Sequence, residues 1–84
     1  MNLIIPDPMK ELLRGLEKKT RKLIGAELRK FQDDKPVDLK KIKTEKDRYR
    51  IAVGDWRIML FVQKESGQKI YHVFDVVIQK DAYR

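Results

Sequence analysis

Three arginines lie around one predicted turn in the segment RYRIAVGDWRI, residues 48–58. Arg48 and Arg50 precede Gly54-Asp55, and Arg57 follows it. A guanidinium binds phosphate through two parallel hydrogen bonds and stabilises the negative charge that builds on a reacting phosphate. The segment is therefore a phosphate site if the arginines share one face, or else an ordinary hairpin with a basic, solvated face.

The amino-acid composition limits the kinds of site and partner that this protein can have. The 84 residues include no cysteine and one histidine, His72. These counts exclude a thiolate metal site and a multi-histidine metal site. The 20 lysines and arginines against 13 acids leave a charge of +7, which favours polyanions, nucleic acid first and acidic proteins second. No apolar run is long enough to span a membrane, and we expect a cytoplasmic protein that needs no metal or cofactor.

The turn sets the register of the first hairpin. A two-residue loop with glycine first, Gly54-Asp55, suits a type II′ turn. The register gives one apolar face, which we expect to form the core, from the pairs Val53–Trp56, Ile51–Ile58 and Tyr49–Leu60. The opposite face carries the pairs Ala52–Arg57 and Arg50–Met59. Arg50 and Arg57 are thus predicted to be diagonal neighbours on one face, and Arg48 lies further along it.

The second hairpin is predicted to turn through three residues, Glu65-Ser66-Gly67, with glycine in the left-handed conformation. This register places Tyr71, Val73 and Asp75 on the arginine face, with Asp75 beside Arg57, and places His72 on the core face. A two-residue loop at Ser66-Gly67 would instead press Asp75 against the core, which is costly for an unpaired carboxylate. His72 is interpreted as a core or rim residue, not a catalytic one.

The N-terminal half predicts a short edge strand over residues 2–5 and two helices. Asp7 is expected to cap the first helix, with Pro8 at its first position. Thr20 is expected to cap the second. Apolar residues recur at helical spacing at Met9, Leu12, Leu13, Leu16, Leu23, Ile24, Leu28 and Phe31. With strands at 48–53, 56–63 and 69–77, the sequence predicts one α+β domain over residues 1–84: a two-helix hairpin packed on a mainly antiparallel sheet of about four strands.

The stretch LKKIKTEKDRYRIAVGDWRIMLFV, residues 39–62, resembles the RelE/ParE superfamily of toxins from type II toxin–antitoxin modules. The shared pattern is a Leu-Lys-rich lead-in followed by Tyr-Arg-x-x-Val-Gly-Asp-Tyr-Arg, with Trp56 replacing the usual tyrosine. The resemblance implies a RelE-like fold. It also implies a metal-independent endoribonuclease that cuts messenger RNA in the ribosomal A site and is neutralised by an antitoxin, which we expect to be acidic.

The resemblance also implies roles for particular residues. The implied catalytic residues are Arg50, Arg57, Lys80 and Tyr83. The basic lead-in is a candidate for RNA binding, or else a solvated loop; its residues are Lys40, Lys41, Lys43, Lys46 and Arg48. The apolar residues predicted beside the arginines are expected to bind the antitoxin; they are Met59, Phe61, Tyr71 and Val73.

Two departures from the pattern leave alternatives open. Ala52 and Gln79 stand where the family has basic residues, although Lys80 follows Gln79 directly. Asp75, if it pairs with Arg57, removes part of the positive charge at the phosphate site. The alternatives are a ParE-like inhibitor of DNA gyrase, and a catalytically weakened member that mainly binds an antitoxin.

Overall fold

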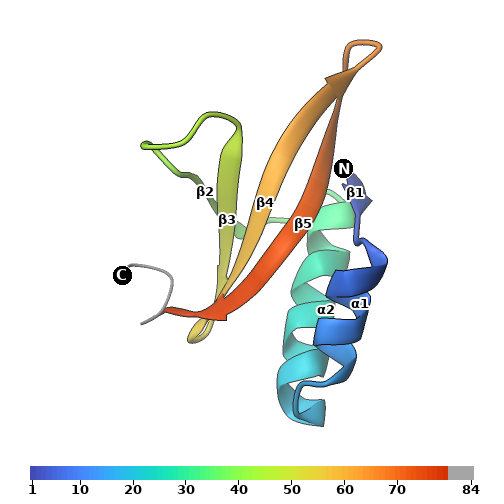
Figure 1. Cartoon of the computed structure of the whole chain (residues 1–84), viewed down its shortest axis with the longest axis vertical. Helices are drawn as coiled ribbons and strands as arrows, with labels where there is room; N and C mark the ends of the chain where they lie inside the picture. Colours follow the sequence, from blue (N-terminus) through green and yellow to red (C-terminus); the bar gives the residue numbers. More distant parts are fainter. Residues whose placement is uncertain (80–84) are drawn as a thin grey trace.

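A five-stranded sheet with two helices on one of its faces makes up the protein (Figure 1), and the computed structural model describes residues 1–79 of it. In chain order the elements are β1 (Asn2–Ile4), α1 (Asp7–Arg14), α2 (Lys18–Gln32), β2 (Asp38–Lys41), β3 (Arg48–Val53), β4 (Trp56–Glu65) and β5 (Gln68–Ile78). The strand order is β1-β5-β4-β3-β2; β1 runs parallel to β5, and the other pairs are antiparallel. The predicted α+β architecture, two helices packed on a mainly antiparallel sheet, is confirmed. The sheet has one strand more than expected, because β2 forms within the segment interpreted as a loop.

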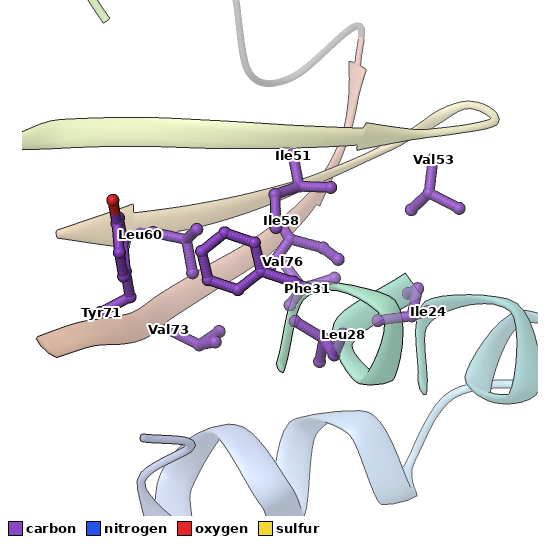
Figure 2. Packing of buried hydrophobic residues seen from close by; sticks show 10 residues of the cluster. All are labelled: Ile24, Leu28, Phe31, Ile51, Val53, Ile58, Leu60, Tyr71, Val73 and Val76. Atoms are coloured by element: carbon purple, nitrogen blue, oxygen red, sulfur yellow. The ribbon is translucent and has the colours of Figure 1, made fainter. Parts of the chain in front are cut away.

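The core lies between α2 and the sheet (Figure 2). Ile24, Leu28 and Phe31 follow one another at helical spacing, so they share the buried face of α2. They pack against alternate residues of the strands, namely Ile51, Val53, Ile58, Leu60, Tyr71, Val73 and Val76. The predicted apolar residues of α1 pack at the margin of this cluster. Leu23, predicted for the same stripe, is 47% exposed.

The helix ends lie close to, but not at, the predicted residues. Asp7 is the first residue of α1 and Pro6 is its N-cap, so the carboxylate does not cap the helix. α2 begins at Lys18, with Glu17 as its N-cap, so Thr20 lies inside the helix. Among the described residues, no helix is long and apolar enough to cross a membrane.

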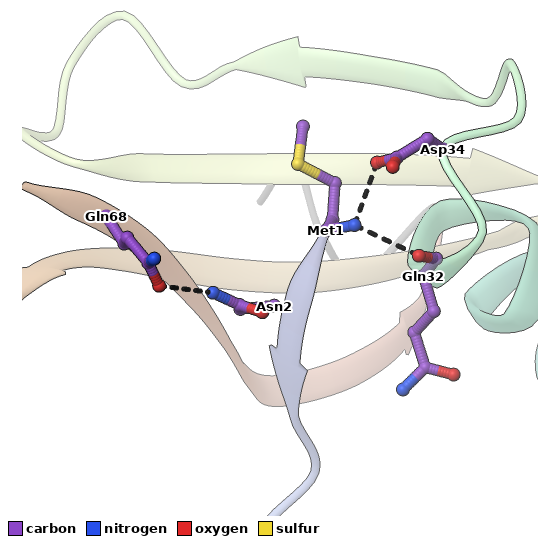
Figure 3. A network of polar contacts seen from close by, with 5 residues as sticks. All are labelled: Met1, Asn2, Gln32, Asp34 and Gln68. Atoms are coloured by element: carbon purple, nitrogen blue, oxygen red, sulfur yellow. Dashed lines mark hydrogen bonds and ion pairs between the residues drawn. The ribbon is translucent and has the colours of Figure 1, made fainter.

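The N-terminus holds β1 against the end of α2 (Figure 3). The Met1 ammonium donates to the Gln32 carbonyl at 3.0 Å and lies 2.8 Å from Oδ1 of Asp34. Asp34 has a φ of 59°, the left-handed conformation that commonly ends a helix. On the other side of β1, Asn2 Nδ2 donates to Gln68 Oε1 at 3.2 Å.

The β3–β4 hairpin has the predicted register. All five predicted cross-strand pairs form, from Val53–Trp56 at the turn to Tyr49–Leu60. Gly54 has a φ of 57°, as the first position of a type II′ turn requires. This hairpin therefore sends Arg50 and Arg57 to the face opposite the core.

The predicted register of the β4–β5 hairpin is wrong. The loop has two residues, Ser66 and Gly67, whose φ values of 50° and 79° are those of a type I′ turn. The register shifts once further along, because Leu60 pairs with Val73 and Met59 pairs with Asp75. Phe74 is the extra residue of a β-bulge. The bulge keeps Asp75 off the core face, which removes the objection to the shorter loop.

Candidate nucleic-acid interface

One face of the sheet points away from both helices, and we call it the outer face. Its side chains are those that alternate with the core residues along β2, β3, β4 and β5. They belong to Asp38, Lys40, Arg48, Arg50, Ala52, Arg57, Met59, Phe61, His72, Asp75 and Val77, and the bulge residue Phe74 lies among them. All three predicted arginines lie here, so the tertiary structure brings them to a common surface.

Arg57 is the most buried charged residue of the described chain, with 8% of its surface exposed. Its Nη1 donates to the carbonyl oxygens of Gly54 at 3.0 Å and Trp56 at 2.8 Å, so the guanidinium holds the β3–β4 turn. Its Nε is buried and has no hydrogen-bond partner within residues 1–79. A buried donor without a partner is costly and calls for a ligand or another explanation.

Arg50 lies diagonally across from Arg57, because Arg50 pairs with Met59 and Arg57 pairs with Ala52. Diagonal neighbours of this kind are roughly 7–8 Å apart. The Arg50 side chain is 15% exposed, and its Nη1 lies 3.9 Å from Oδ1 of Asp38 on β2. That separation is too long for a hydrogen bond, and Nη1 is likewise buried without a partner in the described chain. Two unsatisfied guanidinium donors therefore lie on neighbouring strands.

The prediction that Asp75 lies beside Arg57 in an ion pair is not met. Asp75 is paired with Met59, and its Oδ1 accepts a hydrogen bond from the backbone N–H of Val76 at 2.9 Å. Arg57 is paired with Val77 and belongs to no ion pair of the described residues. The two-residue turn and the bulge are the cause, because each moves Asp75 one position along β4, from Arg57 to Met59. The acid that lies beside Arg50 is instead Asp38, which was not among the predicted residues of the site.

Aromatic side chains occupy the adjoining part of the outer face. Phe61 and His72 are stacked with ring centroids 4.5 Å apart and planes 4° from parallel. Phe74 lies 6.1 Å from Phe61 and is 37% exposed. The Arg48 guanidinium carbon lies 4.7 Å from the centroid of Phe74 and 5.3 Å from that of Phe61, which is cation–π distance. We call these four residues the aromatic cluster.

The shifted register corrects three predictions. Tyr71 and Val73, expected to bind an antitoxin, are 4% and 0% exposed and belong to the core. The ring of Tyr71 packs edge-on against those of Phe31 and Tyr49, with ring centroids 4.9 Å and 5.9 Å apart. Its burial, together with Tyr49, raises the pKa of Tyr71 above that of a free tyrosine. His72, expected on the core side, lies on the outer face instead.

The predicted RNA-binding residues do not form one patch. Lys40 lies on the outer face of β2, opposite Arg50, whereas Lys41 lies opposite Tyr49 and points to the other face. Lys43 and Lys46 are exposed in the connection between β2 and β3. Arg48 belongs to the aromatic cluster, and its Nε lies 3.5 Å from Oε2 of Glu45. Lys40 and Arg48 therefore share the surface of Arg50 and Arg57, whereas Lys41 lies on the other face and Lys43 and Lys46 lie outside the strands.

The C-terminal candidates Lys80 and Tyr83 lie outside the described residues. Gln79, the last described residue, donates its backbone N–H to the Asp55 carbonyl at 2.7 Å. This contact places the end of β5 beside the turn that Arg57 holds. Within residues 1–79 there is no group of three histidine, cysteine or acidic residues that would bind a metal ion.

Sequence reasoning missed Asp38, His72 and Phe74 as members of this surface. The apolar alternation of Val37 and Leu39 was a strand signal that would have found Asp38. The dipeptide Ser66-Gly67 is typical of a two-residue turn. A hairpin registered from that turn would have placed His72 opposite Phe61, on the outer face. Nothing in the local sequence marks Phe74 as a bulge.

Comparison with known proteins shows a likeness to solved structures and none to a family model. No family model matches the chain, and neither does any curated protein. Among solved structures, the chain is similar to a chain of the RelB–RelE antitoxin–toxin complex from Methanococcus jannaschii, with a TM-score of 0.66 and 24% sequence identity. The match covers 95% of this chain and 94% of the other. This likeness shows a shared fold over nearly the whole length of both chains.

Proposed function

We propose that this chain is a RelE-type toxin of a toxin–antitoxin pair, which cleaves messenger RNA on the ribosome and is neutralised by an acidic antitoxin. The observation that carries the proposal is the pair Arg50 and Arg57 at diagonal positions of the outer face, neither of them hydrogen-bonded to an acid among residues 1–79. Two such guanidinium groups would hold the oxygen atoms of one phosphate between them. The shared fold with a chain of the RelB–RelE complex and the charge of +7 support the same conclusion.

The proposed reaction is attack of a ribose 2′-OH on the adjacent phosphorus. The new P–O2′ bond forms as the P–O5′ bond breaks, which leaves a cyclic phosphate and a free 5′-OH. Arg50 and Arg57 would stabilise the negative charge on the phosphate oxygens, but neither arginine can accept the 2′-OH proton, because a guanidinium does not deprotonate in proteins. The 2′-OH proton must therefore pass to another group, and the leaving O5′ must receive a proton. The resemblance implies Tyr83 as the candidate for proton transfer and Lys80 as a substitute for a cation that Gln79 does not supply.

The proposal is tested by primer extension on messenger RNA held on purified ribosomes. We expect the wild-type protein to cut the message, and Arg50→Ala and Arg57→Ala each to slow cleavage by about 10²–10³-fold, as removal of a charge-stabilising donor does in other enzymes. Arg29→Ala is the matched control, since Arg29 is an exposed arginine of α2 on the opposite side of the sheet. Its cleavage rate is expected to equal that of the wild type.

Folding must be separated from chemistry, because Arg57 also holds a turn. Thermal unfolding of each variant serves that purpose, and Arg50→Ala is the cleaner test because Arg50 makes no hydrogen bond of its own in the described chain. A folded Arg50→Ala protein that cleaves at the wild-type rate would show that the arginine pair does not act on the phosphate. Absence of cleavage by the wild type would refute the ribonuclease proposal outright.

A second candidate function follows from what the arginine pair lacks. Ala52 supplies no cation opposite Arg57, Gln79 supplies none at the end of β5, and Nη1 of Arg57 is already bonded to the turn. These features favour a member that binds without cutting RNA, either a ParE-like gyrase inhibitor or a protein that mainly binds an antitoxin. Inhibition of gyrase supercoiling by the purified protein, without cleavage of ribosome-bound message, would identify the first of these.

A further inference from the structure

The aromatic cluster has no role in the phosphate chemistry proposed above. It lies on the same outer face, but Phe61 is four positions along β4 from Arg57, and Arg48 is two positions along β3 from Arg50. At about 3.3 Å per residue these separations are about 13 Å and about 7 Å, so the cluster adjoins the phosphate site without being part of it. The cluster needs an explanation of its own.

Its chemistry is that of a site for flat, electron-rich rings. Phe74 presents an aromatic ring that is 37% exposed, with the Arg48 guanidinium 4.7 Å from its centroid. Phe61 contacts the ring of Phe74 and is itself stacked on His72, so the three rings are in contact with one another in a row. Nε2 of His72 is buried and has no hydrogen-bond partner among residues 1–79, so a polar group remains to be satisfied here as well.

The β-bulge accounts for the exposure of Phe74. Without the extra residue, the position after Val73 would be Asp75, and no aromatic side chain would lie between His72 and Asp75 on this face. A bulge re-aims a side chain and is commonly found beside functional sites. The exposed ring of Phe74 lies against the Arg48 guanidinium, and this combination suits a partner that is both flat and negatively charged.

We propose that the aromatic cluster is a stacking subsite for a nucleobase of single-stranded RNA, one or two nucleotides away from the phosphate held by Arg50 and Arg57. The base stacks on Phe74 beside the Arg48 guanidinium. Stacking on an aromatic side chain with a neighbouring cation is how proteins hold single-stranded nucleic acid along a basic surface. This inference deepens the proposed function and rests on it for the position of the phosphate.

The test is a binding measurement that does not require cleavage. The probe is a short fluorescein-labelled RNA with 2′-O-methyl sugars, which cannot undergo 2′-OH attack, and a series of the same RNA in which one base at a time is removed. Fluorescence anisotropy is measured for the wild type, Phe74→Leu and Phe74→Trp. Leu23→Ala is the matched control, since Leu23 is an exposed apolar residue of α2 on the other side of the sheet.

Loss of the stacked base is expected to weaken wild-type binding by between about 5-fold and 100-fold at one position of the series. Phe74→Leu keeps an apolar side chain of similar size but has no aromatic ring. It should bind the intact RNA as weakly as the wild type binds the RNA that lacks the stacked base, and removal of that base should not weaken its binding further. Phe74→Trp and the control Leu23→Ala should both bind each RNA of the series with the affinity of the wild type. A purely structural role for Phe74 would instead weaken binding equally for every RNA of the series.

The two proposals fail in different ways. If the wild type cleaves message on ribosomes but Phe74→Leu binds every probe as the wild type does, the stacking subsite is wrong and the ribonuclease stands. If Phe74→Leu behaves as expected but no cleavage occurs, the subsite stands and the ribonuclease is wrong. Failure of the wild type to bind the RNA overturns the subsite. Unchanged RNA binding, with weakened binding of a purified acidic antitoxin, would show that the cluster is a protein interface.

Discussion

Arg57 belongs both to the framework of the sheet and to the candidate site. Its Nη1 bonds to two carbonyl oxygens of the β3–β4 turn, and its Nε remains unsatisfied within the described residues. The arrangement fixes the guanidinium before any ligand binds, which reduces the conformational entropy lost on binding. The sequence posed two alternatives for this segment, a phosphate site or an ordinary hairpin. Arg57 can serve both, because one of its nitrogens stabilises the turn and the rest of its guanidinium is left for a ligand.

Tyr71 shows the clearest electrostatic consequence of the corrected register. Its burial and the neighbouring Tyr49 raise its pKa in the folded state above the value of about 10 expected when unfolded. The folded state therefore holds the phenol proton more tightly than the unfolded state does. The resulting contribution to stability is complete below pH 10 and is lost as the pH rises through the folded-state pKa.

We therefore expect the free energy of unfolding of the wild type to fall more steeply above pH 10 than that of Tyr71→Phe. The variant keeps the ring against Phe31 but has no proton to lose. Urea unfolding between pH 8 and pH 11 measures both curves, and the region below pH 9 is the internal control, where the two should run parallel. Parallel curves throughout the range would contradict the proposed burial of an ionisable phenol.

At the scale of elements, the bulge in β5 decides which side chains share the outer face. A shift of one residue in a regular ladder exchanges the two faces of a strand. The two-residue turn at Ser66-Gly67 and the bulge at Phe74 each shift the predicted register by one, and together they leave Asp75 outside the core. Between them lie Tyr71, His72 and Val73, and these are the residues whose predicted faces were wrong.

Deletion of Phe74 tests this account directly. The ladder on either side of the bulge would become continuous, with Leu60 opposite Val73 and Met59 opposite Asp75 as before. We expect the deletion variant to fold cooperatively with an unchanged core, which cross-strand nuclear Overhauser effects would establish. Deletion of the core residue Val73 is the control and should prevent cooperative folding, because it removes a fully buried side chain. Equal disruption by both deletions would mean that the bulge is required for the fold.

At the scale of the whole molecule, the charge of +7 supplies attraction to RNA without specifying where it binds. Each phosphate contact to single-stranded nucleic acid contributes about −0.7 to the slope of log K against log salt concentration. Replacing an arginine by alanine lowers the net charge by one wherever the arginine lies. Only the loss of an arginine that contacts a phosphate should change that slope, so the slope distinguishes a residue of the site from one elsewhere on the surface.

We expect Arg57→Ala to flatten the slope by about 0.7, measured by anisotropy with the 2′-O-methyl RNA over a range of salt concentrations. Arg29→Ala, with the same net charge, should leave the slope close to that of the wild type, because Arg29 lies on the helical side of the sheet. If the two variants flatten the slope equally, RNA binding follows the total charge of the protein and not the outer face.

Local patterns were enough to predict the hairpin that carries the arginines, because a glycine-first turn and strict apolar alternation within 11 residues leave one register for Arg50 and Arg57. Local periodicity likewise predicted the α+β class and the buried face of α2, apart from the exposed Leu23. The register of β5 could be known only from the folded sheet, since the bulge depends on strand pairing and has no local signal at Phe74. For the same reason only the structure placed β2 at the edge beside Arg50, buried Tyr71 and Val73, and gathered Arg48, Phe61, His72 and Phe74 into one cluster.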